Sequence, residues 1–278
     1  MRTIPLFATR SYRSCPRRIA RGNLARSTNP GLSCGLLAFL ILLNGFGACA
    51  VDGSDQTSTS GSRAQVSPDW EAQRQLMVET QLRARDITAP AVLLAMAHVP
   101  RHLFVPERVR AMAYNDHPLP IGYEQTISQP YIVAYMTQLL DLPPNARVLE
   151  VGTGSGYQSG VLAEVAAEVY TIEIVPELAD RSASILAELG YENIRVKAGD
   201  GYLGWPEHAP FDGIMVTAAP DHMPRPLVEQ LAVGATLVLP VGRDFQVMTI
   251  LTKTEVGVTT ERTIPVRFVP MTGRALGR

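Results

Sequence analysis

The chain has 278 residues, of which 46% are hydrophobic and 18% are charged; these are the proportions of a globular protein with room for one sizeable α/β domain plus extensions. The formal net charge of −1 conceals an asymmetry, because residues 1–51 contain seven arginines and no acid, which leaves 18 basic and 26 acidic residues elsewhere, a net charge of −8. An acidic body argues against nucleic acid as the main partner, since phosphate contacts need a basic face.

The first 50 residues are organised like an export signal. All seven arginines lie before residue 27, an apolar run follows at 36–43, and small residues end the segment at 45–50. This order is typical of a secretory signal, and Gly47-Ala48-Cys49 also resembles a lipoprotein attachment box. The alternative is translated upstream sequence with no targeting role. Residues 51–67 are rich in Ser, Thr, Gly, Asp and Gln, so we expect a disordered linker there.

The body is expected to cover residues 68–278 and to begin with helices. Ser67-Pro68-Asp69 predicts a helix start with Ser67 as the N-cap. Helices are predicted over 69–85, 88–97 and 130–140. The proline-rich stretch 99–127 between the last two is expected to be irregular, and its segment 118–122 cannot be a central strand. Residues 68–145 thus form an N-terminal helical extension with a loop.

From residue 146 onward, strands and helices alternate. Strands are predicted over 147–151, 169–175, 194–198, 211–218 and 235–241, and helices over 157–167, 176–189 and 226–231. This alternation predicts a Rossmann-like α/β fold with a doubly wound, mostly parallel sheet. Alternating segments at 247–251 and 263–269 predict antiparallel strands that complete the sheet.

The first of these strands ends in a glycine turn, Gly152-x-Gly154-x-Gly156. Glycines there allow unusual dihedral angles and a close approach of the backbone to a ligand. The third glycine comes one position earlier than in the G-x-G-x-x-G dinucleotide fingerprint, which disfavours a nicotinamide oxidoreductase.

Acidic residues accompany three consecutive strands: Glu150 in the first, Glu173 at the end of the second and Asp200 after the third. The carboxyl ends of these parallel strands face the crevice where such sheets bind ligands. An acid-lined pocket suits the sulfonium and amine of S-adenosylmethionine better than a pyrophosphate. We expect all three acids and the three glycines of the turn at the cofactor, with Glu173 on the ribose hydroxyls and Asp200, with Gly201, near adenine. The alternative is acids that only cap helices in a nucleotide-free fold.

A metal site is not expected. The three cysteines, Cys15, Cys34 and Cys49, all precede the body. His98 and His102 have i, i+4 spacing, but Pro100 between them disfavours a shared helical face.

Several segments together resemble the protein-L-isoaspartate O-methyltransferase family. They are residues 118–122 (PLPIG), 125–130 (QTISQP), 148–158 (VLEVGTGSGYQ), 199–201 (GDG), 209–212 (APFD), 216–220 (VTAAP), 239–242 (LPVG) and 267–270 (RFVP). The resemblance runs from about residue 69 to the C-terminus. The T-I-S-Q-P block is more specific than the glycine turn, which most methyltransferases share. Glu124 departs from the pattern, because the family usually has a small residue or glycine there.

The resemblance implies methyl transfer from S-adenosylmethionine to the free α-carboxylate of L-isoaspartyl, and possibly D-aspartyl, residues in damaged proteins. The ester formed loses its alcohol readily, so a succinimide re-forms and reopens in part to normal aspartate. The carboxylate, with an ordinary pKa near 4, is already ionised at pH 7, so no general base is needed. Alignment and exclusion of water are needed instead.

The resemblance also implies residue roles. Ser128 matches the family's catalytic residue, and its hydroxyl is expected to hold one carboxylate oxygen in line with the methyl group. An alternative role for Ser128 is to cap the helix that begins at Pro130. Thr126 and Ile127 are expected to line the same loop, and Thr217 and Ala218 to border the substrate entrance.

Three other readings remain open: another Rossmann-fold methyltransferase with a small-molecule substrate, a nicotinamide enzyme, and an exported binding protein that kept the fold. Two lines of reasoning predict different cellular locations for the protein. The family and the cofactor supply favour the cytoplasm, whereas residues 1–50 favour an exported, periplasmic or lipid-anchored protein. The oligomeric state cannot be read from the sequence, and a monomer is favoured.

Overall fold

The computed structural model describes residues 69–275, so the expectations for 1–50 and 51–67 lie outside the described residues. The helices are α1 (Trp70–Met77), α2 (Pro90–His98), α3 (Pro130–Leu139), α4 (Tyr157–Ala163), α5 (Pro176–Glu188) and α6 (Arg225–Gln230). The strands are β1 (Leu119–Gly122), β2 (Gln125–Ile127), β3 (Arg147–Val151), β4 (Glu168–Glu173), β5 (Ile194–Ala198), β6 (Phe211–Val216), β7 (Leu231–Val241), β8 (Gln246–Thr254) and β9 (Gly257–Val266). No helix in this part of the chain is both long and apolar enough to span a bilayer.

Seven strands form one sheet in the order β5-β4-β3-β6-β7-β8-β9. Pairing is parallel from β5 to β7 and antiparallel between β7, β8 and β9, which confirms the predicted mixed sheet. The strand order reverses direction between β3 and β6. In open α/β sheets the crevice at this reversal, outside the carboxyl ends of the strands, is where ligands bind.

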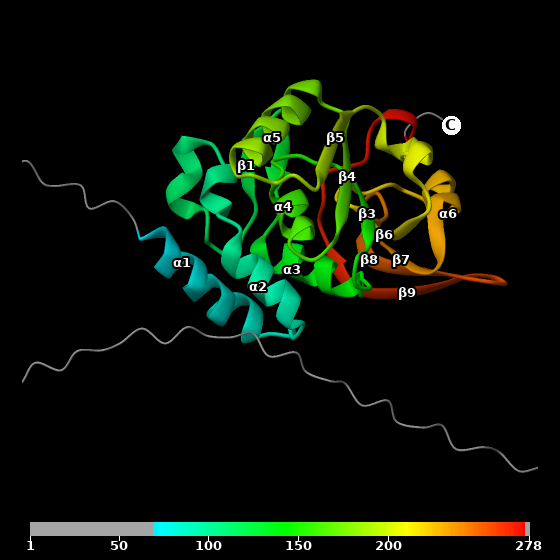
Figure 1. Cartoon of the computed structure of the whole chain (residues 1–278), viewed down its shortest axis with the longest axis horizontal. Coiled ribbons are helices and arrows are strands. Elements are labelled where there is room, and N and C mark those ends of the chain that lie inside the picture. The colour runs from blue at the N-terminus through cyan, green and yellow to red at the C-terminus, as the bar shows by residue number, and fades with distance from the viewer. Residues whose placement is uncertain (1–68, 276–278) are drawn as a thin grey trace, which may run out of the picture. The chain divides into compact units, whose positions relative to one another are not determined.

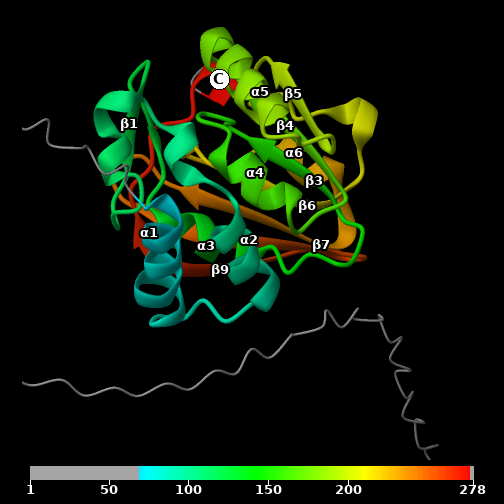
Figure 2. The same cartoon turned by 60° about the vertical axis from the view of Figure 1, so that its left-hand side comes forward.

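Helices lie on both faces of the seven-stranded sheet (Figures 1 and 2). Apolar residues at successive strand positions pack into two different cores, one on each face. Val148 belongs to the core under α1 to α5, whereas Leu149 belongs to the core that includes Leu227 of α6 and the C-terminal Met271. Helices thus cover both faces, but unequally, with most of them on one side.

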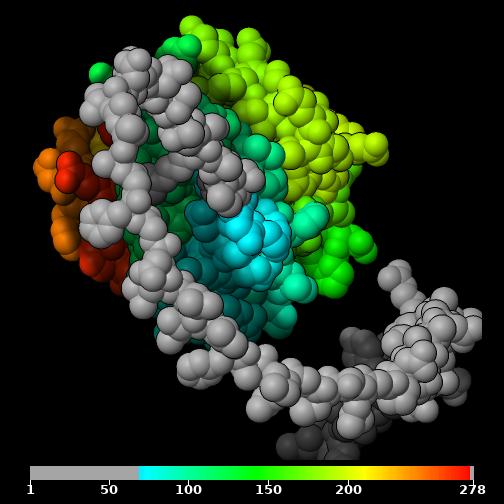
Figure 3. Space-filling model, turned by 90° about the vertical axis from the view of Figure 1, so that its left-hand side faces the viewer, coloured from blue at the N-terminus to red at the C-terminus, as the bar shows by residue number. Residues whose placement is uncertain are grey.

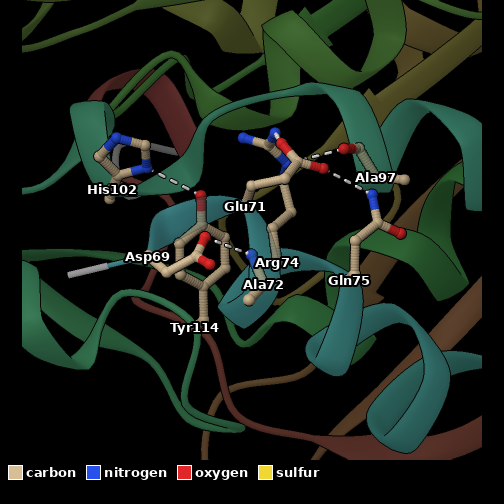
Figure 4. Close-up of polar contacts among 8 residues, drawn as sticks. All are labelled: Asp69, Glu71, Ala72, Arg74, Gln75, Ala97, His102 and Tyr114. Atoms are coloured by element: carbon tan, nitrogen blue, oxygen red, sulfur yellow. Dashed lines mark hydrogen bonds and ion pairs between the residues drawn. The ribbon is translucent and has the colours of Figure 1, made fainter. Parts of the chain in front are cut away.

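The N-terminal part differs in detail from the sequence-based expectation. The N-cap is Asp69, whose carboxylate accepts from the backbone N–H of Ala72 (2.9 Å), and not Ser67 (Figure 4). A π-helix over Val78–Arg83 follows α1 and takes up the rest of the predicted helix. In the space-filling view α1 lies at the surface (Figure 3), and its Leu76 is exposed.

The stretch 99–127, expected to be irregular, contains two 3₁₀ helices, η2 (Arg101–Phe104) and η3 (Glu107–Met112), and the hairpin of β1 and β2. The hairpin is a separate two-stranded sheet, so Pro120 breaks no central ladder. Tyr123 and Glu124 turn it with φ of 53° and 57°. This left-handed backbone favours glycine, which explains why a small residue would suit position 124.

Several predicted bounds differ by a few residues, such as that of α4, which ends at Ala163 and not at 167. The difference that matters for the site lies at the C-terminal end. β9 ends at Val266, three residues before the predicted end, and the chain then leaves the sheet. It turns back over the end of β6, where the N–H of Ala219 donates to Val269 and the N–H of Met271 donates to Ala219. The segment 267–272 is thereby placed beside the carboxyl ends of the strands.

Candidate active site

The glycine turn connects β3 to α4 and approaches the end of β6 closely. Gly152 has φ of 101°, and a Cβ added there would meet the hydroxyl of Thr217. That hydroxyl donates to the carbonyl of Gly152 (2.6 Å). Gly156, with φ of 86°, packs against Ser182 of α5, so its lack of a side chain serves helix packing.

Glu173 lies at the end of β4, and its carboxylate holds two backbone segments. One oxygen accepts from the N–H of Gly154 (2.7 Å) and the other from the N–H of Val175 (3.0 Å). Only 4% of Glu173 is exposed. Charge-assisted hydrogen bonds of this kind fix the carboxylate in one orientation beside the glycine turn.

Asp200 follows β5 and connects the turn there to the C-terminal segment. One carboxylate oxygen accepts from the N–H of Tyr202 (3.0 Å), and the other accepts from the N–H of Arg274 (2.8 Å). Gly201, next in the chain, packs directly on Val151 of β3. The end of the chain is therefore fastened to the same carboxylate that was predicted to serve the cofactor.

A cavity of about 200 Å³ lies at the carboxyl ends of these strands. Its lining includes the sequence-predicted residues Gly152, Gly154, Glu173, Asp200, Gly201, Thr126, Thr217 and Ala218. Two carboxylates and no basic side chain line it, so the first cavity suits a cationic ligand. S-adenosylmethionine, with a sulfonium and an amine, fits this donor set, and a pyrophosphate does not.

A second cavity, of about 480 Å³, lies beside the first. Ser128 and Ile132 line it, and Arg267 is its only charged lining residue. Thr126 and Thr217 line both cavities, and with Ser128 they also line a small pocket of about 40 Å³ against the glycine turn. The two cavities therefore adjoin at these residues.

Ser128 does not cap α3. The N-cap is Gln129, and it makes no side-chain capping hydrogen bond. Within the described residues, the hydroxyl of Ser128 makes no hydrogen bond, so it is available to a ligand. Ile127 is buried beneath the loop and lines only the small pocket.

Two residues predicted to contact the cofactor, Gly156 and Glu150, line none of the three cavities. Ala218, predicted to border the substrate entrance, lines the first cavity and not the second. Glu150, predicted to contact the cofactor, is completely buried inside the sheet and lines none of the three cavities. Its carboxylate accepts from the hydroxyls of Ser159 and Thr171, and burial raises its pKa to about 8. Glu150 of β3 thus connects α4, through Ser159, to β4, through Thr171.

Sequence reasoning missed the contribution of residues 265–272. Val269, Pro270, Met271 and Thr272 line the first cavity, and residues 265–269 line the second. The signal was present in Arg267 to Pro270, one of the segments that carried the family resemblance. Which cavity they line depends on where β9 ends, and periodicity does not fix that point.

The strand order, the glycine turn and the acidic cavity beside the reversal of strand order between β3 and β6 define an S-adenosylmethionine-dependent methyltransferase. A family model described as "Protein-L-isoaspartate(D-aspartate) O-methyltransferase (PCMT)" matches residues 72–276. The chain is 60% identical over 198 residues to the protein-L-isoaspartate O-methyltransferase of Gloeobacter violaceus, a match covering 70% of this chain and 97% of that protein. It is 50% identical over 250 residues to protein-L-isoaspartate O-methyltransferase 2 of an Anaeromyxobacter species, covering 89% of this chain and 98% of that protein.

The solved structures agree with these matches. One described as a β-aspartate methyltransferase from Plasmodium falciparum, in complex with S-adenosyl-L-homocysteine, is 27% identical with a TM-score of 0.62 and covers 72% of this chain and 98% of that one. A second protein-L-isoaspartate O-methyltransferase, 24% identical with a TM-score of 0.67, covers 74% of this chain and 67% of that one and shares the fold. The chain belongs to the protein-L-isoaspartate O-methyltransferase family. Its activity is the methylation of isoaspartyl residues by S-adenosylmethionine for protein repair.

Proposed function

We propose that the first cavity holds the methyl donor and the second holds the isoaspartyl residue, with transfer where the two adjoin. The opposite charges of the two linings carry this proposal. Glu173 and Asp200 line the side that would hold a cationic cofactor, and Arg267 lines the side that would hold an anionic carboxylate. Attraction between opposite charges then favours each ligand in its own cavity.

Bound S-adenosylmethionine supplies an electrophilic methyl group on a sulfonium. The residues of this chain have to bind, align and shield the acceptor. The free hydroxyl of Ser128 donates to one oxygen of the α-carboxylate and orients the other oxygen toward the donor cavity. Thr126 and Thr217 form the walls between the two ligands, and Ile127 supports the loop from below. Such alignment supplies much of the rate in reactions that need no proton transfer.

On the donor side, we propose that Glu173 accepts hydrogen bonds from the ribose hydroxyls with the lone pairs that its two backbone partners leave free. Asp200 and Gly201 border the adenine, and Gly152 and Gly154 allow the backbone to approach the rest of the cofactor. The supporting observation is that all five line the first cavity.

Blocking each cavity separately tests this division. Ile132 lines only the second cavity, so Ile132→Trp is expected to raise KM for an isoaspartyl peptide about tenfold or more while the Kd of S-adenosylhomocysteine stays within about twofold. Ala218 lines only the first cavity, so Ala218→Leu is expected to weaken S-adenosylhomocysteine about tenfold. Calorimetric titration and steady-state kinetics measure both. Loss of cofactor affinity in Ile132→Trp would contradict the assignment.

We propose the cytoplasm as the site of action, because S-adenosylmethionine is made there. The signal-like order of residues 1–50 supports the alternative of an exported protein. The match to the Anaeromyxobacter relative covers 89% of the chain and so extends upstream of residue 72, where the family model begins. The intact mass of the native protein decides the matter, since cleavage before Val51 or a lipid on Cys49 would overturn the cytoplasmic location.

A further inference from the structure

Arg101 is a fully buried cation with no ion pair among the described residues. It begins η2, and none of its surface is exposed. Burial lowers its pKa to about 10, so it still carries its charge at pH 7. Burying an unpaired charge is costly unless hydrogen bonds compensate it. The contacts of this guanidinium indicate what the buried charge does in the fold.

The guanidinium contacts three segments of the chain, two of which, at Ser128 and Tyr157, line the small pocket against the glycine turn. Its Nε donates to the carbonyl of Ala113 (2.7 Å), and its Nη2 donates to the carbonyl of Ser128 (2.7 Å). The charge also lies 4.9 Å from the centre of the Tyr157 ring, the first residue of α4 after the glycine turn. One rigid group thus contacts both the loop that carries Ser128 and the helix that follows the turn.

The position of Arg101 is itself fixed by its neighbours. The ring of His102 stacks on Trp70 of α1, with centroids 4.7 Å apart. Its Nδ1 lies 2.8 Å from the hydroxyl of Tyr114 (Figure 4). Two consecutive residues, Arg101 and His102, therefore contact two consecutive residues, Ala113 and Tyr114. These two connections fix the position of the guanidinium that donates to the Ser128 carbonyl.

We propose that Arg101 is a positioning residue that acts through Ser128: it fixes the backbone of Ser128 relative to the glycine turn and thereby the aim of the serine hydroxyl. The inference rests on the role proposed for Ser128. A charge-assisted hydrogen bond to a carbonyl is stronger and better oriented than a neutral one, and a shift of about 1 Å in such a site can cost about 10²-fold in rate. The charge behind the loop also favours an anionic substrate carboxylate in front of it.

The test combines Arg101→Lys and Arg101→Met with Ser128→Ala in double-mutant cycles. Lysine keeps a charge but lacks the fork that reaches two carbonyls, and methionine keeps only the volume. In the otherwise unchanged enzyme, each substitution is expected to lower kcat about ten- to hundredfold, with the Kd of S-adenosylhomocysteine within about twofold. In the Ser128→Ala background, the further loss is expected to be less than about threefold. Amide hydrogens of residues 126–129 are expected to exchange faster in Arg101→Lys without cofactor or substrate.

Leu227→Ala is the control for lost stability, because Leu227 is fully buried on α6 in the opposite core. All rates are compared below the unfolding midpoint of each variant. An equal fall in kcat in Leu227→Ala would overturn the proposal, as would an undiminished effect of Arg101→Lys in the Ser128→Ala background. Unchanged exchange at 126–129 would do the same. Wild-type turnover in Ser128→Ala alone would instead overturn the role of Ser128, so the two failures are distinguishable.

Discussion

Replacing Ser128 by alanine is expected to lower kcat for an isoaspartyl peptide by about 10²- to 10³-fold, the usual effect of removing one hydrogen-bond donor aimed at a reacting oxygen. The hydroxyl has no hydrogen-bond partner in the described part of the chain, so the substitution removes no structural contact. The Kd of S-adenosylhomocysteine should stay within about twofold, because Ser128 does not line the first cavity.

Ser184→Ala is the matched control. Ser184 lies on the exposed face of α5, where its hydroxyl donates to the carbonyl of Asp180, and it should keep wild-type kinetics. Steady-state and single-turnover measurements of methyl transfer separate chemistry from product release. If the single-turnover rate of Ser128→Ala equals that of the wild type, the proposed alignment of the carboxylate is wrong.

Substituting Glu150 by glutamine is expected to flatten the dependence of stability on pH. In the folded protein burial raises the pKa of Glu150 from 4.5 to about 8. The folded state therefore keeps a proton that the unfolded state has lost. The contribution of this group is fully present below pH 4.5 and is lost as the pH rises toward 8. Over this range the slope is about −1.4 kcal/mol per pH unit, the value for a difference of one bound proton.

Glutamine is neutral at every pH, and its carbonyl can still accept from the hydroxyls of Ser159 and Thr171. The free energy of unfolding, measured by denaturant titration from pH 5 to pH 8, should therefore fall more steeply in the wild type than in Glu150→Gln. Glu177→Gln, the same change in the exposed first turn of α5, should keep the wild-type slope. Identical slopes in the wild type and Glu150→Gln would show that Glu150 is ionised in the folded protein.

The sequence was sufficient for the sheet and for the donor side of the site. Apolar runs ending in glycine or an acid located β3, β4 and β5, and carboxyl ends of parallel strands must share one edge. Glu173 and Asp200 could therefore be assigned to one cavity from the pattern alone. Ser128 was found through the family resemblance, since nothing in its local pattern distinguishes a catalytic serine from a helix cap.

The remaining features depend on tertiary packing. A strand buried on both faces has no polar side, so periodicity could not show that Glu150 points away from the ligand. Arg101 stands next to Pro100 in a segment without helical or strand periodicity, and its contacts join residues 12 and 27 positions away. The wall formed by residues 265–272 follows from where β9 ends, a boundary set by pairing with β8.

The methylation of isoaspartyl carboxylates by this protein can be measured directly. The decisive experiment is transfer of a labelled methyl group from S-adenosylmethionine to two synthetic peptides of one sequence, one with isoaspartate and one with normal aspartate at the same position. The purified protein should methylate the isoaspartyl peptide and leave the aspartyl peptide unmethylated. Equal transfer to both peptides, or to neither, would show that the assigned activity is wrong.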